Sequence, residues 1–278
     1  MSHINRRNAL QLLGATATLG MLRPAWAKHA EDDDTSRRAF VLIHGAWHTG
    51  AAWDEVASRL RLAGHKVEAP TLPGMHPDDN QAGIQFDDYV QTVVDVVQRQ
   101  HHKVILVGHS SAGMLLQAAA PHVAEMLDMV VFNNAFIMAN GQSQLDNIPP
   151  EVAGFLTAVA QSTPDNIIPV SAVADFIRSA LMEGDPIEKQ DALLASLLAQ
   201  PFALLSTPVN TKPFEALHIP KAVLFCLRDH SADYLGMATR LGSYRTVTAN
   251  GSHEMLFSAP AGYTKALVKL ISLTHCAS

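Results

Sequence analysis

Short apolar runs and amphipathic segments alternate along most of the chain. Most of the short runs are rich in β-branched residues, which predicts strands buried on both faces. The amphipathic segments repeat apolar residues at helical spacing, as in residues 87–99, where four valines fall on one face. Strands are predicted over residues 40–43, 65–69, 104–107, 129–132, 222–226 and 244–247, and helices over residues 51–62, 87–99, 114–120 and 263–273.

Strands that alternate with helices need right-handed crossovers, which predicts a parallel sheet with helices on both faces. The pattern changes over residues 135–217, where no strand pattern appears and prolines interrupt apolar helical segments. We interpret this segment as an inserted helical cap. The sequence therefore predicts an α/β fold with a six-stranded, mainly parallel sheet in one domain over residues 39–278.

The composition fits one domain with an insertion. The chain has 278 residues, of which 48% are hydrophobic, enough for one sizeable core. Its formal net charge of −6 argues against a nucleic-acid partner. Cys226 falls in a predicted buried strand and Cys276 lies near the C-terminus, and whether the two pair is left open.

Residues 1–27 have the layout of an export signal. They contain no acidic residue, and Arg6 and Arg7 precede an apolar run that ends before a small-x-small cleavage site, Ala25-Trp26-Ala27. The paired arginines resemble the twin-arginine type. The apolar run is too short to act as a stable membrane anchor. We therefore expect a periplasmic or secreted protein in which residues 28–38 form a flexible lead-in.

The most informative stretch follows the predicted strand at residues 104–107. A turn of small residues contains Ser110 and leads directly into a predicted helix, an arrangement typical of a nucleophile elbow. The tight turn lifts the hydroxyl clear of the sheet, and the next backbone N–H points toward the same place. The usual pattern Gly-x-Ser-x-Gly here ends in Ala112, so a serine that only caps the helix is the alternative.

A serine hydroxyl needs a base to accept its proton, and the base needs an acid to orient it. With such an elbow the chain order is serine, acid, histidine. His253 lies in the loop after the last predicted strand and is the candidate base. Asp229 follows the strand at residues 222–226 and is the candidate acid, with Asp233 as its rival. The other position used for the acid, after the fourth strand, reads Asn133-Asn134, which cannot carry the charge.

Four motifs resemble one group of enzymes. They are Val41-Leu42-Ile43-His44-Gly45-Ala46-Trp47-His48, Gly108-His109-Ser110, Arg228-Asp229 and Gly251-Ser252-His253-Glu254-Met255. In this order they resemble the plant methylesterase and hydroxynitrile lyase family and its bacterial esterase relatives, within the α/β-hydrolase superfamily. The resemblance runs from about Phe40 to the C-terminus. It implies the α/β-hydrolase fold, Asp229 as the acid, and hydrolysis of a small-molecule ester.

The remaining site residues follow from this arrangement. The backbone N–H groups of Ala46 and Ser111 are expected to form the oxyanion hole, since Gly45 lets the backbone approach closely. No metal-binding motif is evident, so neither a metal nor another cofactor is expected. The expected pocket lies between the elbow and the cap and favours an apolar or aromatic substrate. Its candidate substrate-binding residues are Trp47, Met114, Phe136 and Met255, with Leu145, Phe155, Phe202, Leu205 and Leu256 as further apolar candidates.

Two alternatives to an esterase remain open on the sequence. One is a hydroxynitrile lyase, which shares the fold and the serine, histidine and aspartate. The resemblance argues against it, because the lyases carry a threonine where this chain has Gly45 and a lysine where it has Glu254. The other is a binding protein on an inactive hydrolase fold. The natural substrate and the oligomeric state are not determined by the sequence.

Overall fold

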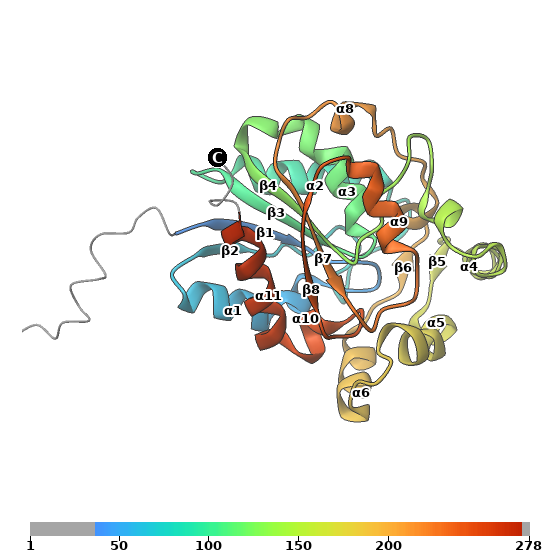
Figure 1. The fold of residues 1–278 in the computed structure, drawn as a ribbon. Helices are drawn as coiled ribbons and strands as arrows, with labels where there is room; N and C mark the ends of the chain where they lie inside the picture. Colours follow the sequence, from blue (N-terminus) through green and yellow to red (C-terminus); the bar gives the residue numbers. More distant parts are fainter. Residues whose placement is uncertain (1–36, 274–278) are drawn as a thin grey trace, which may run out of the picture. The chain divides into compact units, whose positions relative to one another are not determined.

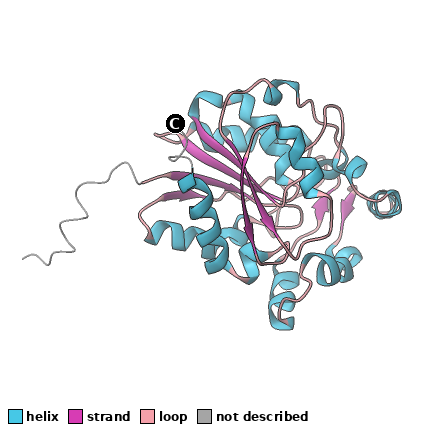
Figure 2. Ribbon diagram, in the orientation of Figure 1, coloured by secondary structure: helices cyan, strands magenta, loops and turns pink. Residues whose placement is uncertain are grey.

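The computed structural model describes residues 37–273, whose centre is a six-stranded sheet. Its strand order is β2-β1-β3-β4-β7-β8, and every neighbouring pair is parallel (Figures 1 and 2). The predicted six-stranded sheet is confirmed, and the observed strand ends lie within two residues of the predicted ones. The strands are β1 (Ala39–Ile43), β2 (Lys66–Glu68), β3 (Val104–His109), β4 (Leu127–Asn133), β7 (Lys221–Cys226) and β8 (Arg245–Ala249).

The two faces of the sheet carry separate apolar clusters. Along β1, Val41 and Ile43 join one cluster while Phe40 and Leu42 join the other, as the two-residue repeat of a strand requires. Helices α2 and α3 cover the first face, and α1 and α11 cover the second (Figure 1). Helices outside the insertion are α1 (Asp54–Leu62), α2 (Phe86–Gln98), α3 (Ala112–Ala119), α9 (Tyr234–Ala238), α10 (Met255–Ser258) and α11 (Pro260–Ser272), with 3₁₀ turns at Gly50–Trp53, Ala120–His122, Ala124–Met126 and Thr239–Leu241.

The insertion between β4 and β7 is mostly helical, but the expectation that it lacks strands is wrong. Two short strands pair antiparallel, Ile167 with Pro201 and Ile168 with Gln200. Strands of two residues are too short to show a two-residue repeat in the sequence. The insertion contains α4 (Pro150–Gln161), β5 (Ile167–Ile168), α5 (Val170–Phe176), α6 (Ile187–Ser196), β6 (Gln200–Pro201), α7 (Ala203–Ser206) and α8 (Lys212–Glu215), with a 3₁₀ turn at Gln144–Asn147 and a π-helical turn at Ile177–Leu181.

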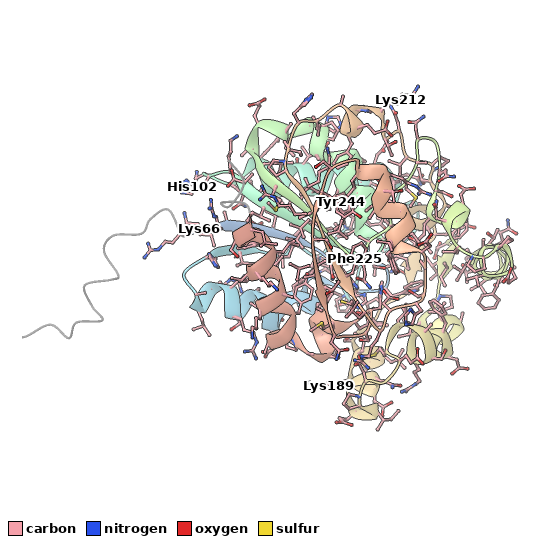
Figure 3. The ribbon with its side chains drawn as sticks, viewed as in Figure 1. Lys66, His102, Lys189, Lys212, Phe225 and Tyr244 are labelled. Carbon is pink, nitrogen blue, oxygen red and sulfur yellow. The ribbon has the colours of Figure 1, made fainter. Side chains whose placement is uncertain are left out.

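The cap helices α4, α5 and α6 lie beyond the carboxyl ends of the sheet strands (Figure 1). Figure 3 shows the same arrangement with side chains, Phe225 on β7 within the sheet and Lys189 on the outlying α6. Loops at the carboxyl ends of parallel strands are the usual place for a ligand site in such folds. The proposed catalytic residues all lie on these loops.

Some expectations concern parts of the chain outside the described residues. These are the export signal at residues 1–27, most of the lead-in at residues 28–38, and Cys276. Cys226 is described and carries a buried free thiol. Over residues 37–273, no helix has both the length and the apolar character needed to cross a bilayer.

Candidate active site

Ser110 sits at a strained turn between β3 and α3. Its φ of 55° lies in the left-handed region, which is unusual for a residue other than glycine. Three backbone hydrogen bonds hold the turn. Ser110 N–H donates to the Asn133 carbonyl (3.2 Å), and the Ser110 carbonyl accepts from Gly113 N–H (3.1 Å) and Phe136 N–H (3.0 Å). The half-buried Ser110 is thereby fixed at the end of the sheet, as a nucleophile elbow requires.

The packing of α3 explains why alanine is tolerated at the fifth position of the motif. Ala112 is fully buried, so its methyl group is accommodated there. The close approach occurs one residue later, where a Cβ on Gly113 would collide with the Phe136 carbonyl oxygen. At Gly108 a Cβ would come within 2.7 Å of Leu116. The glycines that this elbow needs are therefore Gly108 and Gly113.

His253 and Asp229 form a buried pair. His253 Nδ1 lies 2.5 Å from Asp229 Oδ2, and the other carboxylate oxygen accepts hydrogen bonds from Ser231 N–H (3.0 Å) and Ser231 Oγ (2.6 Å). Burial alone would raise the pKa of Asp229, but His253 and these donors outweigh it and keep the pKa well below its usual range. Burial alone would lower the pKa of His253, but Asp229 raises it above its usual value.

Asp233, the alternative candidate for the acid, caps a helix instead. Its Oδ1 accepts from Gly236 N–H (2.8 Å) and so caps the N-terminus of α9. Asp229, and not Asp233, is the carboxylate that the fold brings to His253.

Asn134 contributes to the site in a way that the sequence did not suggest. Its side-chain N–H₂ donates to Asp229 Oδ2, and its side-chain oxygen accepts from Cys226 N–H (2.7 Å). Asn134 therefore cannot replace the acid but holds the acid in place. One feature of the sequence could have indicated this role: Asn134 follows β4, which is the other position used for a catalytic acid.

Tyr234 is a second residue at the site that the sequence did not indicate. Its ring stacks on His253 with centroids 5.8 Å apart, and its hydroxyl lies 3.1 Å from Ser231 Oγ and 3.4 Å from His253 Nδ1. Phe136, a predicted pocket residue, packs edge-on against Tyr234 at 5.7 Å. Burial raises the pKa of Tyr234 well above its usual value, so this phenol stays neutral.

The Gly45–Ala46 peptide is oriented by His44. His44 Nε2 accepts from Leu72 N–H (3.0 Å), so its Nδ1 carries the proton and donates to the Gly45 carbonyl (2.9 Å). Because a trans peptide directs its C=O and N–H to opposite sides, this bond also fixes the direction of the Ala46 N–H. A Cβ on Gly45 would lie 2.8 Å from Ser110 Cβ, which places this peptide directly beside the elbow.

Two further ionisable groups lie buried beside His253. His48 donates from Nδ1 to the Ala46 carbonyl (2.8 Å), and its Nε2 lies 3.1 Å from Glu254 Oε2. Burial alone would lower the pKa of His48, but Glu254 raises it; burial alone would raise the pKa of Glu254, but His48 and His109 lower it to about 2. Glu254 is 1% exposed. Its carboxylate is thus paired with His48 rather than free to face a substrate.

His109 links this pair to the base. Its ring lies 4.6 Å from that of His253 and 5.8 Å from that of His48, and its Nε2 donates to the His253 carbonyl (3.1 Å). Burial lowers the pKa of His109 to about 3, as it does for His44. Both rings are therefore neutral and act through hydrogen bonds and packing.

Ligand atoms of His109, His253 and Glu254 lie within 4.8 Å of one another, close enough to hold a metal ion in principle. Each residue already has a protein partner: the His253 carbonyl for His109, Asp229 for His253, and His48 for Glu254. A metal would have to compete with all three contacts. Metal-independent catalysis therefore stays our prediction.

An apolar pocket of about 210 Å³ opens between Trp47 and the cap. Trp47 directly follows Ala46, and its Nε1 donates to the Ile168 carbonyl of the cap strand β5 (3.3 Å). Phe155 and Phe176 are 50% and 40% exposed at this pocket. The remaining lining residues are Glu151, Val152, Leu156, Ala172 and Val173.

The four predicted substrate-binding residues do not all meet. Trp47, Met114 and Phe136 share the apolar cluster that includes the cap. Met255 instead packs in the cluster on the opposite face of the sheet, under Gly251 and Gly262. A residue directly after Glu254 points away from the site because α10 begins there and turns its first side chain toward α11.

Comparison with known proteins identifies the family of this chain and its relatives. The sequence model described as "Alpha/beta hydrolase family" matches residues 40–266. A carbendazim hydrolyzing esterase of Nocardioides sp. is 34% identical over 41% of this chain and 50% of the relative, so the match spans half of that protein. A pyrethroid hydrolase of Sphingobium wenxiniae is 29% identical over 68% of this chain and 70% of the relative.

A solved structure extends the likeness over the whole fold. An extracellular alpha/beta-hydrolase of a Paenibacillus species superposes with a TM-score of 0.78 at 28% identity, covering 84% of this chain and 98% of that one. That hydrolase is described as sharing structural and functional homology with Tobacco Salicylic Acid Binding Protein 2. Plant methylesterases and hydroxynitrile lyases are also relatives, which confirms the resemblance predicted from the motifs.

Proposed function

The chain belongs to the alpha/beta hydrolase family, and from that membership we propose that it is a serine esterase for small to medium apolar or aromatic esters. The observation that carries the proposal is the buried bond between His253 and Asp229. The His253 ring packs against His109, the residue directly before Ser110, whose backbone is strained. A serine fixed at a strained turn and an imidazole oriented by a carboxylate are the two groups that nucleophilic catalysis needs.

The proposed reaction has two halves. Ser110 Oγ attacks the ester carbonyl while His253 accepts its proton, and Asp229 orients the ring and stabilises the imidazolium. His253 then donates that proton to the leaving alcohol, which leaves an acyl group on Ser110. In the second half His253 activates a water molecule that attacks the acyl group, and the carboxylic acid product is released from Ser110. These reaction steps need no metal and no cofactor.

The charge that develops on the carbonyl oxygen would be stabilised by the N–H groups of Ala46 and Ser111. Ser111 precedes the first turn of α3, where the helix dipole adds positive potential. The His44 bond to the Gly45 carbonyl supports the Ala46 half of this oxyanion hole. Each such donor is typically worth about 3 kcal/mol of the activation barrier.

The substrate class rests on the cap pocket and on the relatives. The pocket beside Trp47 is almost wholly apolar and is bordered by two exposed phenylalanines. Two relatives are named for hydrolysis of carbendazim and of pyrethroids. We propose that the pocket receives an apolar or aromatic part of the ester.

A cyanohydrin lyase is the second candidate, and two positions argue against it. Gly45 cannot supply the hydroxyl that the lyases have there, and a side chain at this position would collide with Ser110. At the lysine position stands Glu254, which has no positive charge to stabilise departing cyanide. Because Glu254 is paired with His48, the argument rests on the missing lysine rather than on repulsion by a free carboxylate.

The experiment compares two neighbouring serines on a panel of nitrophenyl esters. Ser110→Ala should remove most turnover, while Ser111→Ala keeps its backbone N–H and should retain much of it. Circular dichroism checks that both variants fold, and cyanide release from mandelonitrile is measured in parallel. Equal losses from both variants would contradict the assignment of Ser110, and cyanide release faster than hydrolysis of every ester would favour the lyase.

A further inference from the structure

One turn of the cap touches both loops that carry the proposed acid and base. It runs from Leu181, the last residue of the π-helical turn, to Asp185, just before α6. The residues that it contacts are Arg228, directly before Asp229, and Ser252 and Glu254, on either side of His253. A single short segment thus bridges two loops that follow different strands, β7 and β8.

Asp185 makes the central contacts with one carboxylate. Its Oδ1 accepts from Arg228 Nη2 (2.7 Å), and its Oδ2 accepts from Ser252 Oγ (2.5 Å). The Asp185 side chain is 4% exposed, whereas that of Arg228 is 37% exposed. Because the carboxylate is buried and each oxygen has a charged or hydroxyl donor, its two bonds hold Arg228 and Ser252 at a fixed separation.

Backbone contacts reinforce the turn. The Glu183 carbonyl accepts from Arg228 Nη1 (2.7 Å), and the Leu181 carbonyl accepts from Glu254 N–H (3.4 Å). Gly184 has a φ of 73°, and a Cβ there would collide with the Arg228 guanidinium. The turn therefore has the backbone conformation and the space that let Arg228 reach across it.

We propose that Asp185 is a positioning residue that couples the seating of the cap to the alignment of the acid and the base. It acts through Arg228 and Ser252, the immediate neighbours of Asp229 and His253. The proposal rests on the esterase function above, because the aligned bond is the one that orients the base. When the Asp185 side chain makes these two contacts, the loops that carry Asp229 and His253 are held at the spacing that the 2.5 Å His253–Asp229 bond requires.

The test replaces Asp185 by Asn and, separately, Ser252 by Ala. Misplacement of catalytic groups by an ångström can cost up to about 100-fold in rate, so kcat should fall by about 10- to 100-fold. KM should change little, because neither residue lies at the pocket beside Trp47. Asp191→Asn is the matched control: it removes a cap carboxylate that pairs with Arg178 (2.6 Å), and activity should be unchanged.

A pH profile separates alignment from general loss of stability. His253 acts as a base when neutral, so kcat/KM falls as the pH drops through its raised pKa. A looser bond to Asp229 lowers that pKa, and the acid limb should move to lower pH in both variants. Ser252→Ala changes no charge, so its shift cannot come from a lost carboxylate. The ionisable groups that face His253 are Asp229, Tyr234, His109 and Glu254, with His48 behind Glu254.

Proton NMR provides a readout that does not depend on ester turnover. The far-downfield proton between His253 Nδ1 and Asp229 should shift or broaden in Asp185→Asn and Ser252→Ala, and not in Asp191→Asn. Wild-type kcat, an unchanged acid limb and an unchanged proton resonance in the two variants would overturn the proposal. A wild-type protein without ester turnover would instead overturn the proposed function, and the resonance would still decide the role of Asp185.

Discussion

Four buried histidines, His44, His48, His109 and His253, lie on the loops around the candidate site, and their different partners shift their pKa values in different directions. His44 and His109 have hydrogen bonds to backbone carbonyls and no direct carboxylate partner, so burial keeps the pKa of each near 3. His48 and His253 are just as buried, but each contacts a carboxylate that raises its pKa. At the scale of single residues, the contact with Asp229 or Glu254 therefore decides which ring can hold a proton near neutral pH.

The acid can be tested with two aspartates of the same loop. In Asp229→Asn the shape is kept, but an amide facing Nδ1 favours the wrong imidazole tautomer, so kcat should drop by about 10⁴. Asp233→Asn keeps an oxygen that can cap α9, so turnover and stability should stay close to those of the wild type. Steady-state kinetics on one nitrophenyl ester measures both. A larger loss from Asp233→Asn would reassign the acid.

At the scale of elements, the elbow depends on how closely α3 approaches the loop after β4. Phe136 N–H donates to the Ser110 carbonyl, and Gly113 faces the Phe136 carbonyl without a side chain between them. The strained turn is thus held by the loop after β4 as well as by its own helix. Backbone atoms cannot move aside as a flexible side chain can, so this position tolerates no Cβ without a shift.

Two glycine-to-alanine changes should have opposite effects on stability. Gly113→Ala should destabilise the fold by about 1–3 kcal/mol, because the added methyl group meets a backbone carbonyl. Gly154→Ala, at an exposed position of α4 with open space around its Cβ, should stabilise by about 0.5–1 kcal/mol. Chemical denaturation measures both. Similar shifts in the two variants would contradict the packing described for α3.

At the scale of the whole molecule, the cap is fixed to the rest of the fold, and the folded chain is proposed to be exported. The cap is anchored over the sheet by the Asp185 turn and by backbone bonds such as Leu198 N–H to the Trp47 carbonyl (2.9 Å). These contacts connect one insertion to the loops that carry Trp47, Arg228 and Ser252. We propose that a chain folded in this way is exported, since the twin-arginine type of signal serves folded proteins.

The proposed export predicts the mature N-terminus. Signal cleavage after Ala27 should leave Lys28 as the first residue, and replacing Arg6 and Arg7 together by lysine should impair export. Mass spectrometry of periplasmic and culture fractions measures both. Protein that begins at Met1 or Ser2 and stays in the cytoplasm would contradict this proposal.

Local patterns in the sequence determined the framework. The strands β1, β3, β4 and β7 were recognisable because each contains a short apolar run, and the alternation of strands with helices implied the parallel sheet. Ser110 and His253 could be placed because each follows a predicted strand, at the edge where parallel strands bring their loops together. These inferences need only the neighbours of each residue along the chain.

Tertiary structure decided which side chains meet. Asn134 lies 95 residues from Asp229, Asp185 lies 67 from Ser252, and no repeat or motif links either pair. The pairing of β5 with β6 was hidden for the same reason, since each strand is too short to carry a periodic signal. Met255 shows the converse: its place in the motif suggested a pocket residue, but the start of α10 turns it into the other core. Contacts between distant segments depend on register and packing, which the three-dimensional fold fixes.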